Sequence, residues 1–252
     1  MKKSKQRIVV KVGTSTLTHD SGALDLRSME RLVRTLADLQ GAGNEVILVT
    51  SGAIAVGTAK LGLAERPKEL RMKQAAAAVG QCRMMHIYDK LFSEYNRTVA
   101  QILLTGDDVD DPGRAEHLSG TFSALLEMGT IPIVNENDSV SSAEIETGHH
   151  KVLGDNDTLS AIVAKLCRAD LLVLLSDIDG LYDADPRSHP DARLIHQVPA
   201  AWPPSSPRPA SPWAPGATWS SPTASGRRIS TASWRVRTSA RGFWPRDKEA
   251  RS

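Results

Sequence analysis

Two polar tetrads hold the residue types in this chain that are best suited to binding a small charged ligand. Residues 135–138 (Asn-Glu-Asn-Asp) follow the apolar run 131–134, and residues 154–157 (Gly-Asp-Asn-Asp) precede a helical pattern. Carboxylates and amides at the exit of a strand suit a cationic, hydrogen-bonding ligand. Two ordinary turns would have the same composition, because Asn and Asp favour turns. Neither tetrad alone distinguishes a binding site from a turn.

A lysine lies at the end of the first apolar segment, directly before a turn of small residues. Lys11 interrupts the aliphatic run 8–12, which ends in Gly13, Thr14 and Ser15. Such a turn offers backbone N–H groups and hydroxyls to a phosphate, and the lysine adds charge. The lysine precedes the turn, so this is not the P-loop pattern. A lysine in an edge strand would produce the same sequence.

The elements that must position these residues alternate along the chain. The strand segments are continuous aliphatic runs, which predicts a mostly parallel sheet covered on both faces, a three-layer αβα sandwich. Polar turns follow four of these segments, on the side where such sheets bind ligands. The expected strands are 7–12, 45–49, 99–104, 131–134 and 171–175, and the expected helices are 29–39, 54–61, 70–92, 115–128 and 158–166.

Composition is ordinary for a globular chain. The 252 residues allow one large or two small domains, and 40% are apolar and 24% charged. Cys82 and Cys167 have no metal-ligand spacing and are expected to be reduced thiols. No apolar run approaches the roughly 20 residues of a membrane span, and the N-terminus lacks a signal-peptide core. We expect a cytoplasmic protein that binds no membrane.

Residues 199–252 differ in composition from the rest. They hold nine Pro, nine Ala, ten Ser, eight Arg and all five Trp, and no Leu or Met. Such a segment buries too little aliphatic surface to offset its ordering entropy, so no packed domain is expected there. It could be a basic tail, a nucleic-acid binder or out-of-frame translation. We favour out-of-frame translation, because the change is abrupt, and expect no nucleic-acid partner.

Taken together, five motifs resemble those of the glutamate 5-kinases, a family of the amino-acid kinase superfamily. The resemblance covers 7 to about 198, in order and with similar spacing, and divides the chain into an incomplete kinase domain (1–198) and the tail (199–252). The motifs are 10–15 (Val-Lys-Val-Gly-Thr-Ser), 49–53 (Val-Thr-Ser-Gly-Ala), 135–138, 154–157 and 176–187, which begins Ser-Asp-Ile-Asp-Gly.

The resemblance implies the amino-acid kinase fold and the reaction of ATP with L-glutamate to give ADP and L-glutamyl 5-phosphate, the first step of proline biosynthesis. It also implies Mg²⁺ carried mainly by the nucleotide phosphates, a homo-oligomer, and proline as a possible feedback inhibitor. A carboxylate is already a competent nucleophile, so no general base is needed. The enzyme must instead position two anions and stabilise the transferring phosphoryl group.

On the nucleotide side, the resemblance implies phosphate contacts and nucleotide contacts. Lys11 would contact the ATP phosphates and stabilise the transferring group, and Gly13 and Thr14 would line the phosphate turn. Ser176 and Asp177 would contact the nucleotide.

On the acceptor side, the resemblance implies that Ser51, Asp138 and Asn156 bind glutamate, with Asp138 facing its ammonium group. Asp157 would orient the catalytic lysines or a water on magnesium.

Two departures from the family pattern stand out. Residues 149–150 (His-His) suggest a metal site, but adjacent histidines do not easily face one ion, so we expect a solvent-facing loop. More seriously, the family's Gly-Gly-Met-x-Thr-Lys segment has no match after Val198. We therefore expect weak activity or none. One alternative is an inactive remnant that binds glutamate or nucleotide. Another is a different kinase of the superfamily, but the other superfamily members lack the paired tetrads.

Overall fold

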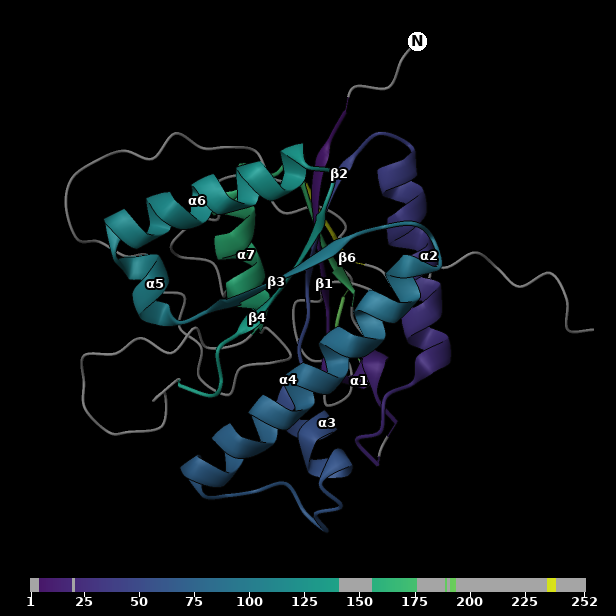
Figure 1. Ribbon diagram of the computed structural model, residues 1–252, viewed down its shortest axis with the longest axis vertical. Coiled ribbons are helices and arrows are strands. Elements are labelled where there is room, and N and C mark those ends of the chain that lie inside the picture. The colour runs from purple at the N-terminus through teal and green to yellow at the C-terminus, as the bar shows by residue number, and fades with distance from the viewer. Residues whose placement is uncertain are drawn as a thin grey trace, which may run out of the picture.

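A parallel sheet forms the middle layer of the fold (Figure 1). The computed structural model describes residues 5–19, 21–140, 156–175, 189, 191–193 and 235–238. Within them the sheet has six strands in the order β3-β4-β2-β1-β5-β6, and every pairing is parallel. The strands are β1 (Arg7–Val12), β2 (Glu45–Val49), β3 (Val99–Leu104), β4 (Ile131–Glu136), β5 (Leu171–Leu175) and β6 (Arg235–Thr238).

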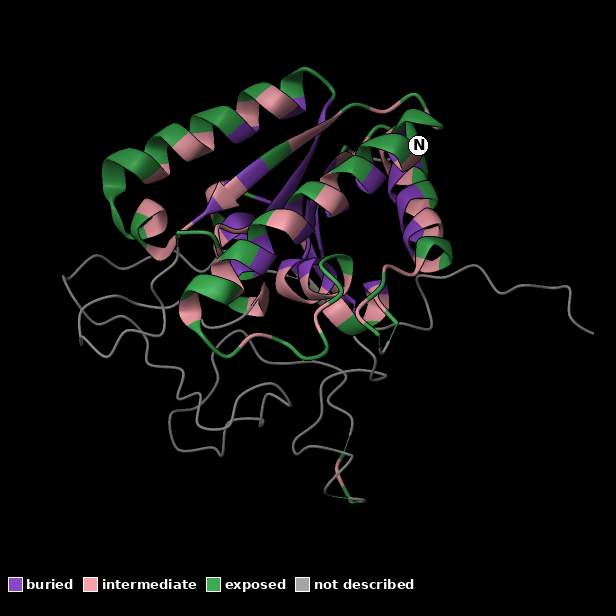
Figure 2. Ribbon diagram, turned by 60° about the horizontal axis from the view of Figure 1, so that its bottom comes forward, coloured by how far each residue is buried: buried purple, intermediate pink, exposed green. Residues whose placement is uncertain are grey.

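Helices cover both faces of this sheet (Figures 1 and 2). The chain moves along the sheet in one direction from β1 to β3 and then turns back towards β5. Right-handed crossovers therefore place α2 and α4 on one face and α6 and α7 on the other. The helices are α1 (Thr14–Leu17), α2 (Leu26–Gly41), α3 (Ala53–Lys60), α4 (Leu70–Ser93), α5 (Gly106–Asp110), α6 (Pro112–Glu127) and α7 (Asn156–Leu166).

Each face of the sheet has its own hydrophobic core, and β1 contributes to both. Val10 and Val12 pack with α2 and α4, whereas Val9 packs with α6 and α7. Successive side chains of a strand point to opposite faces, so Lys11 lies on the same face as Val9. This alternation directs the only charged side chain inside the aliphatic run towards α7.

The expected fold class and strand-helix alternation are confirmed. The differences lie at element ends and in two short helices, α1 and α5. β4 continues two residues beyond the expected end, because Asn135 and Glu136 pair with Leu103 and Leu104 of β3. The helix α5 was not expected. It begins after Thr105, whose side chain and backbone N–H both bond to Asp108 in a capping box.

Four residues of the tail form a strand at the sheet edge. Arg235–Thr238 pairs in parallel with β5, so these residues extend the sheet although the sequence predicts no packed domain in 199–252. The remainder of that segment lies outside the described residues. Among the described residues, none of the helices combines the length and the apolar character needed to cross a membrane.

Candidate functional site

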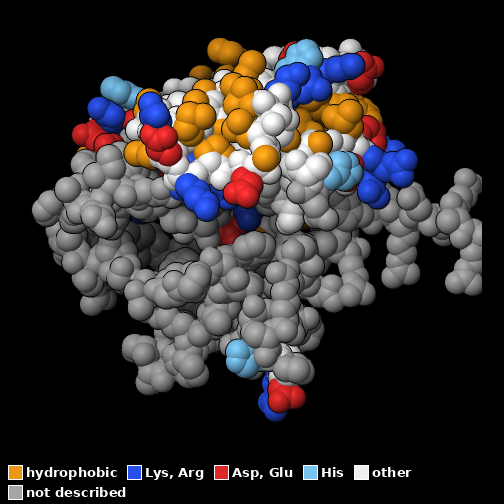
Figure 3. Space-filling view, turned by 90° about the horizontal axis from the view of Figure 1, so that it is seen from below, with side chains coloured by type: hydrophobic (Ala, Val, Ile, Leu, Met, Phe, Trp, Pro, Cys, Tyr) orange, Lys and Arg blue, Asp and Glu red, His pale blue; other side chains and the backbone are white. Residues whose placement is uncertain are grey.

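The carboxyl ends of β1, β2 and β4 lie next to one another, since these parallel strands are neighbours in the sheet. This edge is the one at which open parallel sheets bind ligands. Figure 3 looks at the molecule from this side and shows basic and acidic side chains next to each other, below a gathering of hydrophobic side chains. The motifs that follow β1, β2 and β4 in the sequence are thus brought to one edge.

Lys11 and Asp157 form an ion pair at this edge. The Nζ atom of Lys11 lies 2.8 Å from Oδ1 of Asp157, and Lys11 is 8% exposed. Asp157 is in the first turn of α7, where a negative charge interacts favourably with the helix dipole. The hydroxyl of Ser160 donates to the Asp157 carbonyl oxygen at 2.7 Å. A β carbon added to Gly13 would lie 3.8 Å from the Lys11 Nζ atom, so the turn passes close to the ammonium group.

The turns after β1 and β2 are joined through two hydroxyl groups. Thr14 Oγ1 and Ser51 Oγ lie 3.2 Å apart, and Ser51 also donates to the Val12 carbonyl oxygen at 3.2 Å. Gly52 has φ +96°, and a β carbon there would lie 2.9 Å from Cγ2 of Thr14. Only glycine suits this position, because its backbone is left-handed and the space is already filled. Ser51 is therefore buried between the two turns.

Asp138 is half-buried just beyond the end of β4. Burial, together with the charge of Glu136, raises the pKa of Asp138 to about 6, and the positive charge of Arg66 lowers it too little to offset these effects. A carboxylate in such a place favours a cationic partner, because a positive charge would lower its pKa again. An ammonium group of a ligand is one such partner.

Asn156, the first residue of α7, holds a buried acceptor. Its Oδ1 atom is buried and has no hydrogen-bond partner within the described part of the chain. Buried polar atoms are normally hydrogen-bonded. The structure thus leaves an acceptor next to Asp157 that a ligand donor can satisfy.

The nine residues predicted from the sequence fall into three groups. Lys11 is brought into contact with Asp157, and Thr14 with Ser51. Gly13 and Asn156 are the chain neighbours of Thr14 and Asp157, and Asp138 follows β4 at the same edge. The remaining two, Ser176 and Asp177, lie outside the described residues, as does the 149–150 pair of histidines.

Two buried polar pairs behind this edge were not predicted as functional. Thr50 Oγ1 and Tyr88 OH share a hydrogen bond of 3.0 Å, and Asn135 Nδ2 donates to Gln81 Oε1 at 2.9 Å. Burial raises the pKa of Tyr88, so its hydroxyl stays protonated. A glutamine in the alanine-rich segment of α4 was the sequence signal that could have revealed the second pair.

A resident metal ion would need a cluster of ligating side chains among the described residues. Among them, no cluster of three or more His, Cys, Asp or Glu side chains could hold an ion. A carboxylate next to Lys11, that of Asp157, is ion-paired with it. This donor set suits Mg²⁺ held mainly by phosphate oxygens and water, which is how Mg²⁺ usually binds beside nucleotides.

Comparison with known proteins gives concordant matches. Residues 6–205 match the amino acid kinase family. A glutamate 5-kinase from Clostridium perfringens is 52% identical over 196 residues, which are 78% of this chain and 72% of that protein. A glutamate 5-kinase from Caldanaerobacter subterraneus is 55% identical over 192 residues, 76% of this chain but 50% of that protein.

The fold agrees with a solved structure of low sequence identity. The UMP kinase from Ureaplasma parvum superposes with a TM-score of 0.51 at 15% identity, over 78% of this chain and 77% of that one. At this identity the likeness concerns the fold alone. The match of residues 6–205, together with relatives more than half identical, shows that the chain belongs to the amino acid kinase family and that its relatives there are glutamate 5-kinases.

Proposed function

We propose that this chain has the active site of a glutamate 5-kinase, which transfers the γ-phosphoryl group of ATP to the 5-carboxylate of L-glutamate. The ion pair between Lys11 and Asp157 beside the Gly13 turn is the observation that carries the proposal. The glutamate 5-kinases among its relatives support the same function. The chain spans 72% of one relative and half of another, so the activity is proposed for this chain from a part of their length.

Lys11 supplies positive charge where negative charge accumulates. Two anions, the ATP phosphates and the substrate carboxylate, must approach each other, and the developing charge lies on the transferring phosphoryl oxygens. The ammonium group of Lys11 is buried and held by Asp157, so it needs little reorganisation to meet that charge. Asp157 thus orients the lysine, and the Gly13–Thr14 turn offers backbone N–H groups to phosphate.

The acceptor substrate is assigned to the region of Ser51, Asp138 and Asn156. The half-buried carboxylate of Asp138 pairs with the ammonium group of glutamate, which offsets the burial and the repulsion from Glu136. The buried Oδ1 atom of Asn156 accepts a hydrogen bond from the same end of the substrate. Mg²⁺, when bound with ATP, neutralises phosphate charge.

The sharpest test of the proposed function measures acceptor choice. Purified protein is incubated with ATP and Mg²⁺, and ADP release is followed with glutamate, aspartate, carbamate or UMP as acceptor. Release that depends on glutamate alone is expected. Release with aspartate, carbamate or UMP, and none with glutamate, would contradict the proposal. Binding of glutamate without turnover would identify a non-catalytic relative.

The extent of activity depends on the C-terminal segment. We infer that residues 1–198 form an incomplete kinase domain, because residues 199–252 contain no Gly-Gly-Met-x-Thr-Lys segment with a second lysine. Turnover by the chain is therefore expected to be weak. A chimera that carries the corresponding C-terminal segment of the Clostridium perfringens relative after residue 198 should be at least about 100-fold faster, by analogy with restoring one preorganised donor. Equal rates would show that residues 199–252 suffice.

The remaining inferences follow from the proposed function. We infer a cytoplasmic location, a homo-oligomer and inhibition by proline. Each is testable by fractionation, by sedimentation and by adding proline to the ADP-release assay.

A further inference from the structure

A buried pair of amide side chains lies behind the candidate pocket and has no part in the function proposed above. Asn135, the second-last residue of β4, is 2% exposed, and its Nδ2 atom donates to Oε1 of Gln81 at 2.9 Å. Gln81 comes from α4 and is 8% exposed. Each side chain is thus enclosed, and the bond joins a helix to the exit of a central strand.

The position of Asn135 connects the parts of the pocket. The backbone N–H of Thr50 donates to the carbonyl oxygen of Val134 at 2.9 Å, so Asn135 lies beside the segment that leads into Ser51. Three residues further along the chain is Asp138. A shift of Asn135 would therefore move the start of the loop that carries Asp138.

Gln81 is itself held by close backbone packing. Its neighbour Gly80 touches the start of α3 so closely that an added β carbon would lie 1.8 Å from the Ala53 carbonyl oxygen and 2.7 Å from the Gly57 nitrogen. A helix fixed in this way gives Gln81 little freedom to move. The Gln81 side chain is therefore a rigid support for Asn135.

The amide nitrogen of Gln81 has a spare hydrogen-bonding capacity. Nε2 is buried and has no hydrogen-bond partner within the described part of the chain. Burying an unsatisfied donor is unfavourable, and a pair of apolar side chains would pack at least as well. Simple core packing therefore does not account for an amide pair here.

We propose that Gln81 is a positioning residue for the anionic amino-acid substrate. It holds Asn135, and through it the start of the loop that carries Asp138. The inference rests on the proposed function, because it concerns the pocket assigned to glutamate.

The test compares L-glutamate affinity by calorimetric titration of the full chain. Gln81→Met keeps the shape of the side chain and removes its hydrogen bonds, and the Kd for glutamate is expected to rise about tenfold, or about 1.4 kcal/mol. Two controls on or next to the same helix should leave the Kd within about twofold. They are Cys82→Ser, at an exposed site, and Tyr95→Phe, which breaks the 2.7 Å bond to Glu30 away from the pocket.

A double-mutant cycle distinguishes positioning from a general loss of packing. If Gln81 acts through Asn135, the variant with both Gln81→Met and Asn135→Leu should bind glutamate no more weakly than the weaker single variant. Circular dichroism checks that each variant folds. Should Gln81→Met not fold, Gln81→Leu replaces it. Leucine makes no hydrogen bond to Asn135, so weaker binding is again expected.

The outcomes separate this inference from the proposed function. Unchanged affinity in the Gln81 variant, with normal binding by the wild-type chain, overturns the positioning role alone. Additive losses in the cycle overturn it as well. No glutamate binding by the wild-type chain overturns the proposed function, and the role of Gln81 with it.

Discussion

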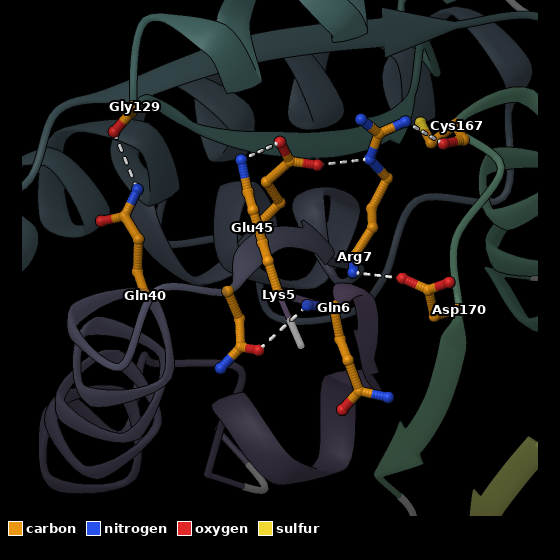
Figure 4. Close-up of polar contacts among 9 residues, drawn as sticks. Lys5, Gln6, Arg7, Gln40, Glu45, Gly129, Cys167 and Asp170 are labelled. Carbon is orange, nitrogen blue, oxygen red and sulfur yellow. Dashed lines mark hydrogen bonds and ion pairs between the residues drawn. The ribbon is translucent and has the colours of Figure 1, made fainter. Parts of the chain in front are cut away.

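Charged side chains at the two ends of the central sheet differ in how well they are paired. At the amino end, the carboxylate of Glu45 forms ion pairs with Lys5 at 2.6 Å and with Arg7 at 2.7 Å (Figure 4). The backbone N–H of Arg7 donates to Asp170 at 2.7 Å, and its guanidinium donates to the Cys167 carbonyl oxygen. These contacts join β1, β2 and the start of β5. Burial opposes ionisation of Glu45, but the two cations outweigh it and lower its pKa.

At the carboxyl end, polar groups are left with less compensation. Burial raises the pKa of Asp138 to about 6. Asn156 and Gln81 each keep a buried polar atom without a partner in the described part of the chain, as Gln40 also does at the amino end. The ion pair of Lys11 with Asp157 is the exception, and it holds a cation in place. The comparison teaches that neighbouring cations compensate the carboxylate at the amino end, whereas the carboxylate of Asp138 at the carboxyl end is left for a cationic ligand.

The largest expected effect comes from removing the cation at the carboxyl end. Lys11→Met should weaken transition-state stabilisation by about 2–4 kcal/mol, because one preorganised charge is lost. The measurement is glutamate-dependent ADP release. Lys5→Met, which removes a lysine at the amino end, is the matched control and should leave the rate unchanged. Full turnover by Lys11→Met would show that the charge of Lys11 is not needed for the reaction.

The next effect concerns the helix contact behind the carboxyl end. Gly80→Ala should lower the free energy of unfolding by about 1–3 kcal/mol, because its β carbon would overlap the Ala53 carbonyl oxygen. Gly120→Ala in α6 is the control: nothing lies within 4 Å of the added carbon, so a gain of about 0.5–1 kcal/mol is expected. Urea unfolding measures the free energy of unfolding of both variants. An unchanged value for Gly80→Ala would show that α4 does not pack this closely against α3.

Asp138→Asn should stabilise the protein while weakening substrate binding. The folded protein holds the Asp138 proton more tightly than the unfolded chain, so stability falls as pH rises from about 4 to about 6, and the loss persists above. Removing the carboxylate should therefore raise the free energy of unfolding at pH 7.5 by about 1–2 kcal/mol, less than the full shift because the group is only half-buried. Calorimetric unfolding and glutamate titration check the two parts.

The smallest expected effect is at the amino end. Glu45→Gln should lower the free energy of unfolding at pH 7 by about 0.5–1 kcal/mol, since its ion pairs are partly exposed. The lowered pKa of Glu45 means that its contribution is present above the ordinary value of 4.5 and disappears as pH falls through the folded-state pKa. Glutamate affinity should not change. A loss of affinity would show that the two ends are coupled.

Much of the fold could be read from local pattern. The aliphatic runs that became β1 to β5 were identified, because strands buried on both faces need apolar residues at every position. The end of β4 could not be identified in this way, since Asn135 belongs to the strand only through its pairing with Leu103 and its bond to Gln81. β6 could not be either, because no aliphatic run marks it.

The sequence by itself determined the residue types of the candidate site and the edge on which they lie. Lys11 before a glycine turn and Asp138 after an aliphatic run follow from neighbours along the chain. Only the tertiary structure decided which of them meet. Lys11 contacts Asp157, and Gln81 contacts Asn135, because strand order and helix packing bring distant segments together. Local preference along a chain carries no information about strand order, so these contacts could not be derived from the sequence pattern.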